Sequence, residues 1–114
     1  MVDCLFCKII KREILSEIIY ENEKVLAFKD ISPKAPVHVL IIPKKHISGI
    51  LELNQENSCL AGEMITAAKE IAESSGLKDT GYRLVFNCGP DAGQAVFHLH
   101  LHLLGGRKLG WPPG

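Results

Sequence analysis

Short hydrophobic runs along the chain predict a set of β-strands. Residues 37–43, VHVLIIP, are almost continuously apolar and β-branched, which is typical of a central strand that is buried on both faces. Asn22-Glu23 separates two further β-rich runs and predicts a tight hairpin turn. The other strands are expected at residues 16–21, 24–29, 82–88 and 96–104.

Helical periodicity marks one long segment, residues 55–75. Apolar side chains recur there at helical spacing, Asn54 is a plausible N-cap, and Gly76 suits the C-terminal stop. A second, short helix is expected within residues 4–12, CLFCKIIKR.

These elements predict an α+β fold: a five-stranded antiparallel sheet with one long and one short helix, the long helix packed on one face. A chain of 114 residues suits a single domain spanning 1–114. The hydrophobic content of 46% is that of an ordinary globular protein.

Charge and cysteine usage narrow the class of function. Thirteen basic and thirteen acidic residues cancel, which gives no electrostatic footprint for nucleic acid or for an anionic membrane. No apolar run reaches the roughly 18 residues of a membrane span, and the N-terminus does not read as a signal peptide. Four cysteines without an export signal indicate a reducing compartment, so we expect a cytoplasmic protein.

The most informative segment is residues 96–104, VFHLHLHLL, where three histidines occupy every second position. Alternate side chains of a strand point to opposite faces. The apolar residues should therefore face the long helix, and the histidines should form a row on an open or ligand-covered surface. The apolar set is Phe97, Leu99, Leu101 and Leu103, and the histidine row is His98, His100 and His102.

The histidine row has three possible interpretations. It could be a solvated strand face. It could be one metal centre, although the outer two Cα atoms would lie about 13 Å apart, which strains a single three-histidine site. Or the roles could be divided, with a central nucleophilic His100 attacking phosphorus while its neighbours hold oxygen atoms or pass protons. The preceding loop 88–94, CGPDAGQ, offers glycine N–H groups that could approach a phosphate.

Several segments of the chain resemble a known protein family. FHLHLHLLGGR is similar to the signature of the histidine triad (HIT) family of nucleotide hydrolases and transferases. DISPKAPVHVLIIPKKHI, GYRLVFNCGPDAGQAVFHLHLHLLGGR and the closing WPPG resemble its Hint branch, the adenosine phosphoramidases. The resemblance implies a two-step displacement at phosphorus, a purine nucleotide as the small-molecule partner, and a symmetric homodimer with the C-terminal tail near the partner's active site.

The resemblance also implies residue roles. His100 matches the nucleophile, and His98 belongs to the same catalytic row. His102 and His38 match residues that line and polarise the phosphate site. Asp30 matches the carboxylate that holds the ribose hydroxyls, for which the residue-level alternative is a helix- or turn-capping carboxylate. The remaining expected nucleotide contacts are Phe28 and Ile31 beside the purine, and Asn87, Gly93 and Gln94 around the phosphate.

One position departs from the Hint pattern. Ala95 stands where that branch usually has a serine, whose hydroxyl is thought to assist the phosphoryl oxygen or the leaving group. The departure puts the rate and the leaving-group preference in doubt and leaves the nucleophile unchanged.

The N-terminal CLFC motif has three interpretations. A redox CxxC normally follows a strand, and none precedes this one. Two cysteines could simply pack as small apolar residues. Alternatively, Cys4 and Cys7 could bind structural zinc with His46 and His98, and some HIT-family relatives carry structural zinc on a similar set. Cys59 and Cys88 are expected to be core residues.

Together with the histidine row, the resemblance implies an enzyme that cleaves the P–N bond of purine nucleoside 5′-phosphoramidates through a nucleotidyl-histidine intermediate. No cofactor is needed for that chemistry. The alternatives are a dinucleoside polyphosphate hydrolase, a nucleotide-binding regulatory or scaffold module whose slow catalysis is incidental, and a zinc protein without a nucleotide role.

Overall fold

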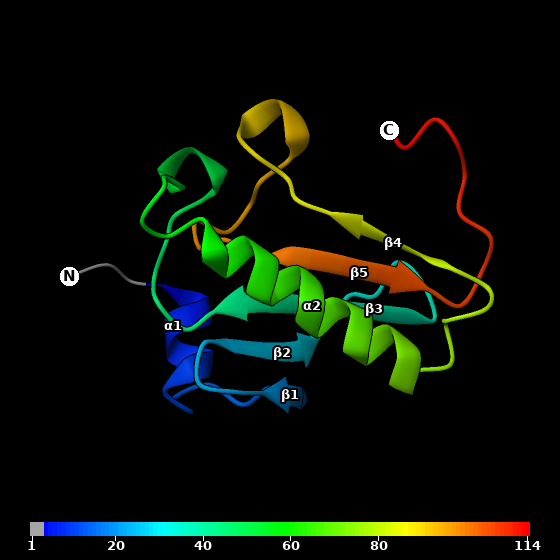
Figure 1. Cartoon of the computed structure of the whole chain (residues 1–114), viewed down its shortest axis with the longest axis horizontal. Coiled ribbons are helices and arrows are strands. Elements are labelled where there is room, and N and C mark those ends of the chain that lie inside the picture. The colour runs from blue at the N-terminus through cyan, green and yellow to red at the C-terminus, as the bar shows by residue number, and fades with distance from the viewer. Residues whose placement is uncertain (1–3) are drawn as a thin grey trace.

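The computed structural model describes residues 4–114 and has the predicted α+β architecture. Five antiparallel strands form one sheet in the order β1-β2-β3-β5-β4 (Figure 1). The strands are β1 (Ile18–Glu21), β2 (Val25–Lys29), β3 (Val37–Pro43), β4 (Tyr82–Val85) and β5 (Leu101–Gly105). The helices are α1 (Leu5–Ile10) and α2 (Cys59–Ser74), with short 3₁₀ turns η1 (Ile50–Glu52) and η2 (Pro90–Ala92).

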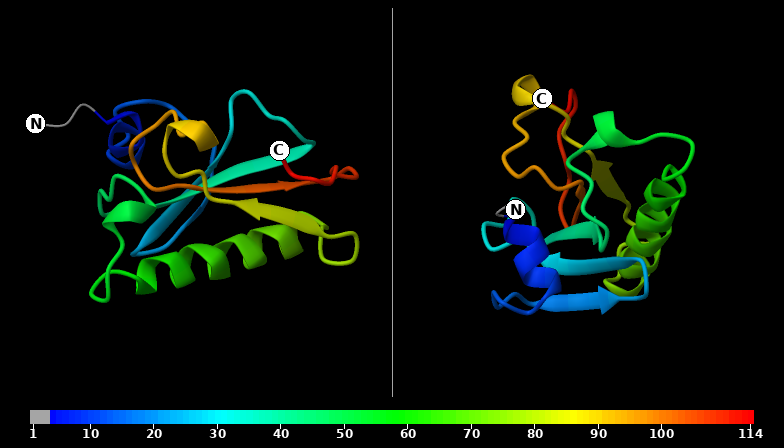
Figure 2. Two further views of the ribbon diagram at one scale, coloured as in Figure 1. Left: turned by 90° about the horizontal axis from the view of Figure 1, so that it is seen from above. Right: turned by 90° about the vertical axis from the view of Figure 1, so that its left-hand side faces the viewer.

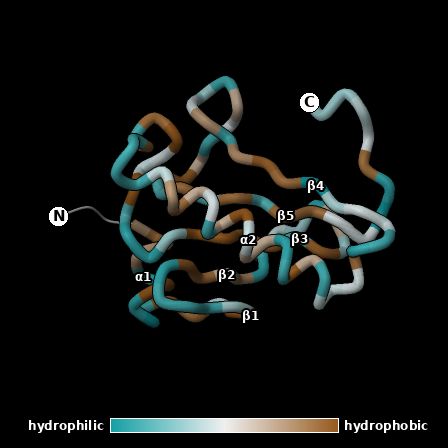
Figure 3. The backbone as a smooth tube through the Cα atoms, in the orientation of Figure 1, coloured by the Kyte–Doolittle hydropathy of each residue, from teal (hydrophilic) through white to brown (hydrophobic). Residues whose placement is uncertain are grey.

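The two helices cover opposite faces of the sheet, as the two views in Figure 2 show. On one face, α2 packs against a core that includes Val39, Ile41, Leu101 and Leu103. On the other face, α1 buries Phe6 and Ile9 against alternate residues of β2 and β3, namely Leu26, Phe28, Leu40 and Ile42. This is why β3 is apolar on both sides, and hydrophobic residues dominate the central strands β2, β3 and β5 (Figure 3).

The sequence predicts the C-terminal end of α2 correctly but not its start. Gly76 has a φ of +78°, the left-handed conformation that ends a helix, as expected. The predicted start is wrong: Asn54 does not cap the helix, whose N-cap is Ser58. Instead, the Asn54 side chain accepts hydrogen bonds from the N–H groups of Glu56 and Asn57 and forms the turn before the helix. Asn22 forms the β1–β2 turn in the same way, which confirms the predicted hairpin.

The predicted strand 96–104 begins only at Leu101. Ile41 pairs with Leu101 in the β3–β5 ladder, and two residues further on β3 ends at Pro43, which has no N–H to extend the ladder. The chain therefore bends at residues 96–98. The shorter β5 also limits β4, which ends at Val85 instead of residue 88.

The expected distribution of side chains around this segment is correct in part. Leu99, Leu101 and Leu103 face α2 and are buried, but Phe97 is 63% exposed because the chain has not yet entered the sheet. The histidines do not form an open row either: His98 is fully buried and His100 is 8% exposed. Cys59, expected in the core, is exposed at the first turn of α2, and Cys88 is half-buried.

Candidate functional site

His100 is held in one tautomer by the backbone. It lies just before β5, and its Nδ1 is 2.7 Å from the backbone carbonyl oxygen of His98. A carbonyl oxygen can only accept, so Nδ1 carries the proton and Nε2 carries the lone pair. The ring of Phe6, from α1, meets the imidazole edge-on with the ring centroids 5.3 Å apart. The His100 ring is thus fixed with an unprotonated nitrogen, the form of imidazole that can act as a nucleophile.

His102 is held in the complementary tautomer. The backbone N–H of Lys34 donates to Nδ1 of His38 at 3.0 Å, so the proton of the His38 ring is on Nε2. That Nε2 lies 2.9 Å from Nδ1 of His102 and donates to it, which leaves the His102 proton on Nε2. The rings of His100 and His102 are 5.1 Å apart. A lone pair on His100 and an N–H on His102 therefore occupy neighbouring rings.

Burial keeps this histidine pair neutral. Desolvation, together with the neighbouring His100 and His38 rings, lowers the pKa of His102 to about 4, against the opposing effect of Asp30. Desolvation also lowers the pKa of His38, again against the effect of Asp30. Near neutral pH both rings are uncharged, which is the state in which the tautomers above are defined.

The Asp30 carboxylate divides its two oxygens between a turn and the histidines. Oδ1 accepts from the N–H of Ser32 at 2.8 Å, the turn-capping role that the residue type alone suggests. Oδ2 lies 3.5 Å from Nε2 of His38. The side chain is about a fifth exposed, so Oδ2 can meet both the histidine pair and a ligand.

An apolar slot lies beside Asp30, between α1 and the sheet. It has a volume of about 140 Å³, and its only polar linings are Ser16 and Asp30. Ile31, at the rim, is 94% exposed, whereas Phe28 is buried and meets Phe6 edge-on with centroids 5.4 Å apart. The full lining is Leu5, Phe6, Ile9, Ile14, Leu15, Ser16, Phe28, Asp30, Ile31 and Leu40. Such a slot suits a flat, apolar ring system.

The loop before the histidines is closed on itself. The N–H of Gly93 donates to Pro90 O and that of Gln94 to Gly89 O, so these two groups are not free donors in this conformation. The Gln94 side chain is equally occupied: Oε1 accepts from Gly89 N–H, while Nε2 donates to Ser48 O and Val96 O. Gln94 thus ties this loop to the segment that follows β3.

Asn87 differs from Gln94 in having its amide unused. It is half-buried after the end of β4, and across residues 4–114 it has no hydrogen-bond partner. Its amide is thus available to a ligand.

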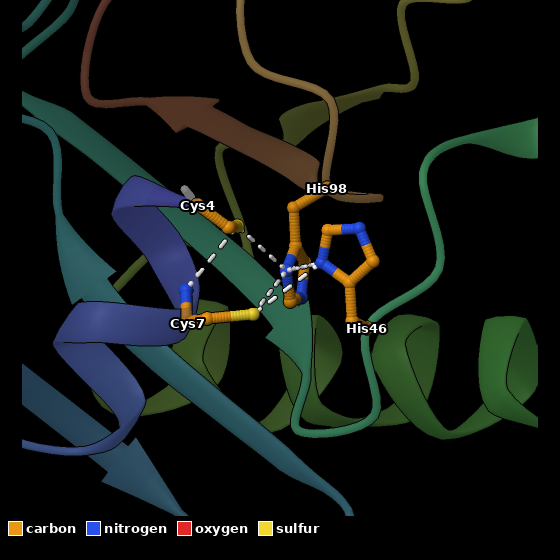
Figure 4. A group of neighbouring side chains, drawn as sticks. All are labelled: Cys4, Cys7, His46 and His98. Atoms are coloured by element: carbon orange, nitrogen blue, oxygen red, sulfur yellow. Dashed lines mark hydrogen bonds between the residues drawn. The ribbon is translucent and has the colours of Figure 1, made fainter. Parts of the chain in front are cut away.

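Four metal-ligating side chains converge at the other end of the histidine row. Cys4 and Cys7 come from α1 and its N-cap, His46 from the segment after β3, and His98 from the chain before β5 (Figure 4). Nδ1 of His98 lies 3.4 Å from Cys4 Sγ, 3.6 Å from Cys7 Sγ and 3.1 Å from Nδ1 of His46, and Cys7 Sγ is 3.3 Å from His46 Nδ1. All four ligand atoms lie within 4.8 Å of one another.

These distances fit a tetrahedral zinc ion. Bonds of 2.3 Å to sulfur and about 2.05 Å to nitrogen place two nitrogens about 3.3 Å apart and a sulfur and a nitrogen about 3.6 Å apart. The His98 tautomer also fits, because its Nε2–H donates to the carbonyl oxygen of Pro43 at 2.9 Å and leaves the Nδ1 lone pair toward the cluster. Burial and the neighbouring Cys4 raise the pKa of the Cys7 thiol, so binding a cation would release protons.

A second group of possible ligands, Asp30, His38 and His102, fits a metal poorly although its atoms are as close. A metal on Nε2 of His38 would require the proton on Nδ1, where the N–H of Lys34 already points. The tautomers therefore separate a metal-binding end of the row from a proton-donating end.

Three groups that shape the site were not singled out from the sequence. They are the carbonyl of Pro43, the N–H of Lys34 and the ring of Phe6. The first two are backbone groups, which carry no signature in residue type, and Phe6 reads as an ordinary apolar residue of a short helix.

Comparison with known proteins identifies the family. The HIT domain profile matches residues 11–109. The chain belongs to the HIT family. It is 53% identical to an uncharacterised HIT-like protein of Synechococcus elongatus, over 98% of this chain and 97% of that one. It is 50% identical to a 14 kDa zinc-binding protein of Zea mays, over 96% of this chain and 87% of that one.

A solved structure supports the same assignment. The HIT family hydrolase of Legionella pneumophila superposes with a TM-score of 0.96 and 52% identity, covering 98% of this chain and all of that one. The chain thus has the fold of HIT family hydrolases.

Within residues 4–114, none of the helices has the length and apolarity that crossing a membrane requires.

Proposed function

We propose that this HIT protein hydrolyses purine nucleoside 5′-phosphoramidates, of the adenylyl-amine or adenylyl-lysine type. The observation that carries the proposal is the hydrogen bond from His100 Nδ1–H to the His98 carbonyl, which leaves Nε2 as a fixed, uncharged nucleophile. It supports the expectation drawn from the family resemblance, that the middle histidine attacks phosphorus.

The first step forms one bond to phosphorus and breaks another. Nε2 of His100 attacks phosphorus, a new P–N bond forms to the imidazole, and the original P–N bond breaks. The amine departs with that electron pair and needs a proton. His102 presents its Nε2–H beside His100, and its Nδ1 is tied to His38. His102 would give its Nε2 proton to the leaving nitrogen as the original P–N bond breaks.

The second step restores the enzyme. Water attacks the phosphorus of the nucleotidyl-histidine, the imidazole P–N bond breaks, and the nucleoside monophosphate leaves. The Nε2 of His102, which has given its proton to the amine, takes up the proton of the attacking water and is restored, while Nδ1 stays paired with His38. The net reaction consumes one water and releases one amine and one nucleotide.

The neighbouring surfaces would select the nucleotide. Phe28 and Ile31 line the apolar slot in which a purine would lie, and Oδ2 of Asp30 would accept from the ribose hydroxyls. Asn87 has a free amide for the phosphate region. Gln94 and Gly93 would act there by holding the loop in shape, since their own groups are already hydrogen-bonded within the loop and to Ser48 O.

Zinc would bind to Cys4, Cys7, His46 and His98 and would act as a structural cross-link between α1 and the start of β5. Two observations support it: the donor geometry, and the zinc-binding name of the Zea mays relative. The chemistry at phosphorus is assigned to this chain's side chains alone.

We also expect a homodimer. β4 is an edge strand with unpaired backbone groups, and Tyr82 on it and Ile65 on α2 are partly exposed apolar residues. Light scattering should give twice the chain mass of 12.5 kDa; a mass of one chain would contradict the expectation.

The proposal is tested by turnover of adenosine 5′-phosphoramidate by the wild type and by His100→Ala. We expect turnover by the wild type and a loss of several hundredfold in the variant, which removes covalent catalysis. The second candidate, a nucleotide-binding module with incidental slow catalysis, is favoured by Ala95, which lacks the serine hydroxyl. Binding of adenosine monophosphate without turnover in the wild type would select it.

A further inference from the structure

The 30–36 loop holds the two groups that define the proton-donating end of the site. Its Ser32 N–H fixes Oδ1 of Asp30 at 2.8 Å, and its Lys34 N–H fixes Nδ1 of His38 at 3.0 Å. Both contacts are made by backbone groups. The position of the loop backbone therefore decides whether Asp30 and His38 keep their orientation.

The Gly106-Arg107 pair, which ends the signature GGR, holds this loop from the far side. Nη2 of Arg107 donates to the carbonyl oxygen of Lys34 at 2.8 Å, across 73 positions of sequence. Gly106 has a φ of +92°, and a Cβ placed on it would lie only 2.9 Å from Cβ of Pro36. A side chain at position 106 would therefore push the loop away as well as strain the backbone.

These contacts connect to the histidine row through one residue. The Lys34 N–H points to His38, and its carbonyl points to Arg107. His38 then donates to His102 at 2.9 Å. If the loop moves, His38 loses the donor that keeps its proton on Nε2, and His102 loses the donor that keeps its own proton directed at the site.

We propose that Gly106 and Arg107 are positioning residues, which hold the 30–36 loop so that Lys34 fixes the tautomer and orientation of His38, and through it of His102. The effect on turnover rests on the proposed function. The effect on the His38 ring does not, and it can be measured in the ligand-free protein.

The main test is nitrogen-15 NMR of the histidine rings in wild type, Arg107→Ala and Gly106→Ala. The wild type should show His38 with an unprotonated, hydrogen-bonded Nδ1 and a protonated Nε2. Both variants should shift the His38 and His102 signals toward mixed tautomers. Arg107→Lys should restore them in part, because an ammonium can still donate one bond to Lys34 O. The matched control is Lys108→Ala, which removes the adjacent positive charge but leaves the Lys108 carbonyl that Arg107 also contacts.

Binding and turnover provide the second readout. Arg107→Ala should bind adenosine monophosphate more weakly and lose about tenfold in kcat/KM, the change expected for about 1.4 kcal/mol from one charge-assisted hydrogen bond. Unchanged His38 and His102 signals in folded Arg107→Ala would overturn the proposal, whatever the effect on stability. If the wild type proves inactive, the proposed function fails while the ring signals still decide this inference. If Arg107→Ala does not fold, Gly106→Ala decides in its place: unchanged His38 and His102 signals in folded Gly106→Ala would overturn the proposal.

Discussion

Removing the proposed zinc ion should destabilise the protein strongly, and substitution of Cys7 should abolish the effect. Cys7 contacts His46 and His98 within 3.6 Å, so Cys7→Ser breaks the proposed ligand set at its centre. The apolar contacts of α1 should remain in the metal-free protein, because Phe6 and Ile9 pack on Leu26, Phe28, Leu40 and Ile42 of the sheet as well as on Cys4. The loss should therefore be limited to the free energy of metal binding.

The size of that loss follows from linkage. Zinc present at 1,000 times its dissociation constant stabilises the folded state by about 4 kcal/mol if it does not bind the unfolded chain. For a domain of this size, about 1 kcal/mol shifts the melting temperature by roughly 4 °C, so the expected shift is about 15 °C.

The assay is thermal unfolding under reducing conditions, with and without a chelator, and zinc content by elemental analysis. Cys59→Ser is the matched control, since Cys59 is exposed on α2, which covers the face of the sheet opposite α1 (Figure 2). The wild type and Cys59→Ser should lose about 15 °C on chelation, and Cys7→Ser should melt at the lower temperature throughout. Equal melting temperatures with and without chelator, or stoichiometric zinc in Cys7→Ser, would refute the reasoning.

Three further predictions concern the histidine pair and the loops around it. The pKa of His102 is about 4 in the folded protein against an ordinary value of 6.5, so only the unfolded chain gains this proton as pH falls between them. Because the ring is only partly buried, solvent screening reduces the full effect, and wild type should lose about 1 kcal/mol more than His102→Asn in urea unfolding between pH 7 and pH 5. Equal losses would contradict the burial argument. A Cβ on Gly49 would lie 3.1 Å from Gln94 Nε2, so Gly49→Ala should lower the stability of the protein by about 1 kcal/mol. Gly62 lies in open space on α2, so Gly62→Ala should raise the stability by up to about 1 kcal/mol. Thermal melts that rank the two variants in the opposite order would be inconsistent with the loop contact. Ala95→Ser should raise the turnover of substrates with poor leaving groups, and an unchanged rate in steady-state assays would show that the hydroxyl has no role here.

The sequence predicted a strand correctly where its residues are buried on both faces of the sheet. Residues 37–43 form β3 with the expected bounds, because an apolar, β-branched run is stable only as a central strand in a chain this short. The alternation of Leu99, Leu101 and Leu103 with histidines also placed the two sets on opposite sides correctly.

The failures around the histidine row share one physical cause: backbone hydrogen bonding between distant segments. Period-two alternation predicts which side a residue faces but does not reveal that Pro43 ends the ladder, so His98 and His100 were expected on a strand and lie before it. The same limit hid the carbonyl and N–H groups that fix each histidine tautomer. Residue type could suggest Cys4, Cys7, His46 and His98 as a set, but only the fold shows that their ligand atoms converge.

The most direct measurement is mass spectrometry of the protein during turnover of adenosine 5′-phosphoramidate, quenched in alkaline denaturant to preserve a phosphorus–imidazole bond. The proposed mechanism predicts one adenylyl group per modified chain, located on the peptide that carries His100 and absent from His100→Ala. Consumption of substrate by the wild type with that peptide unmodified throughout, or with the adenylyl group on another histidine, would contradict it.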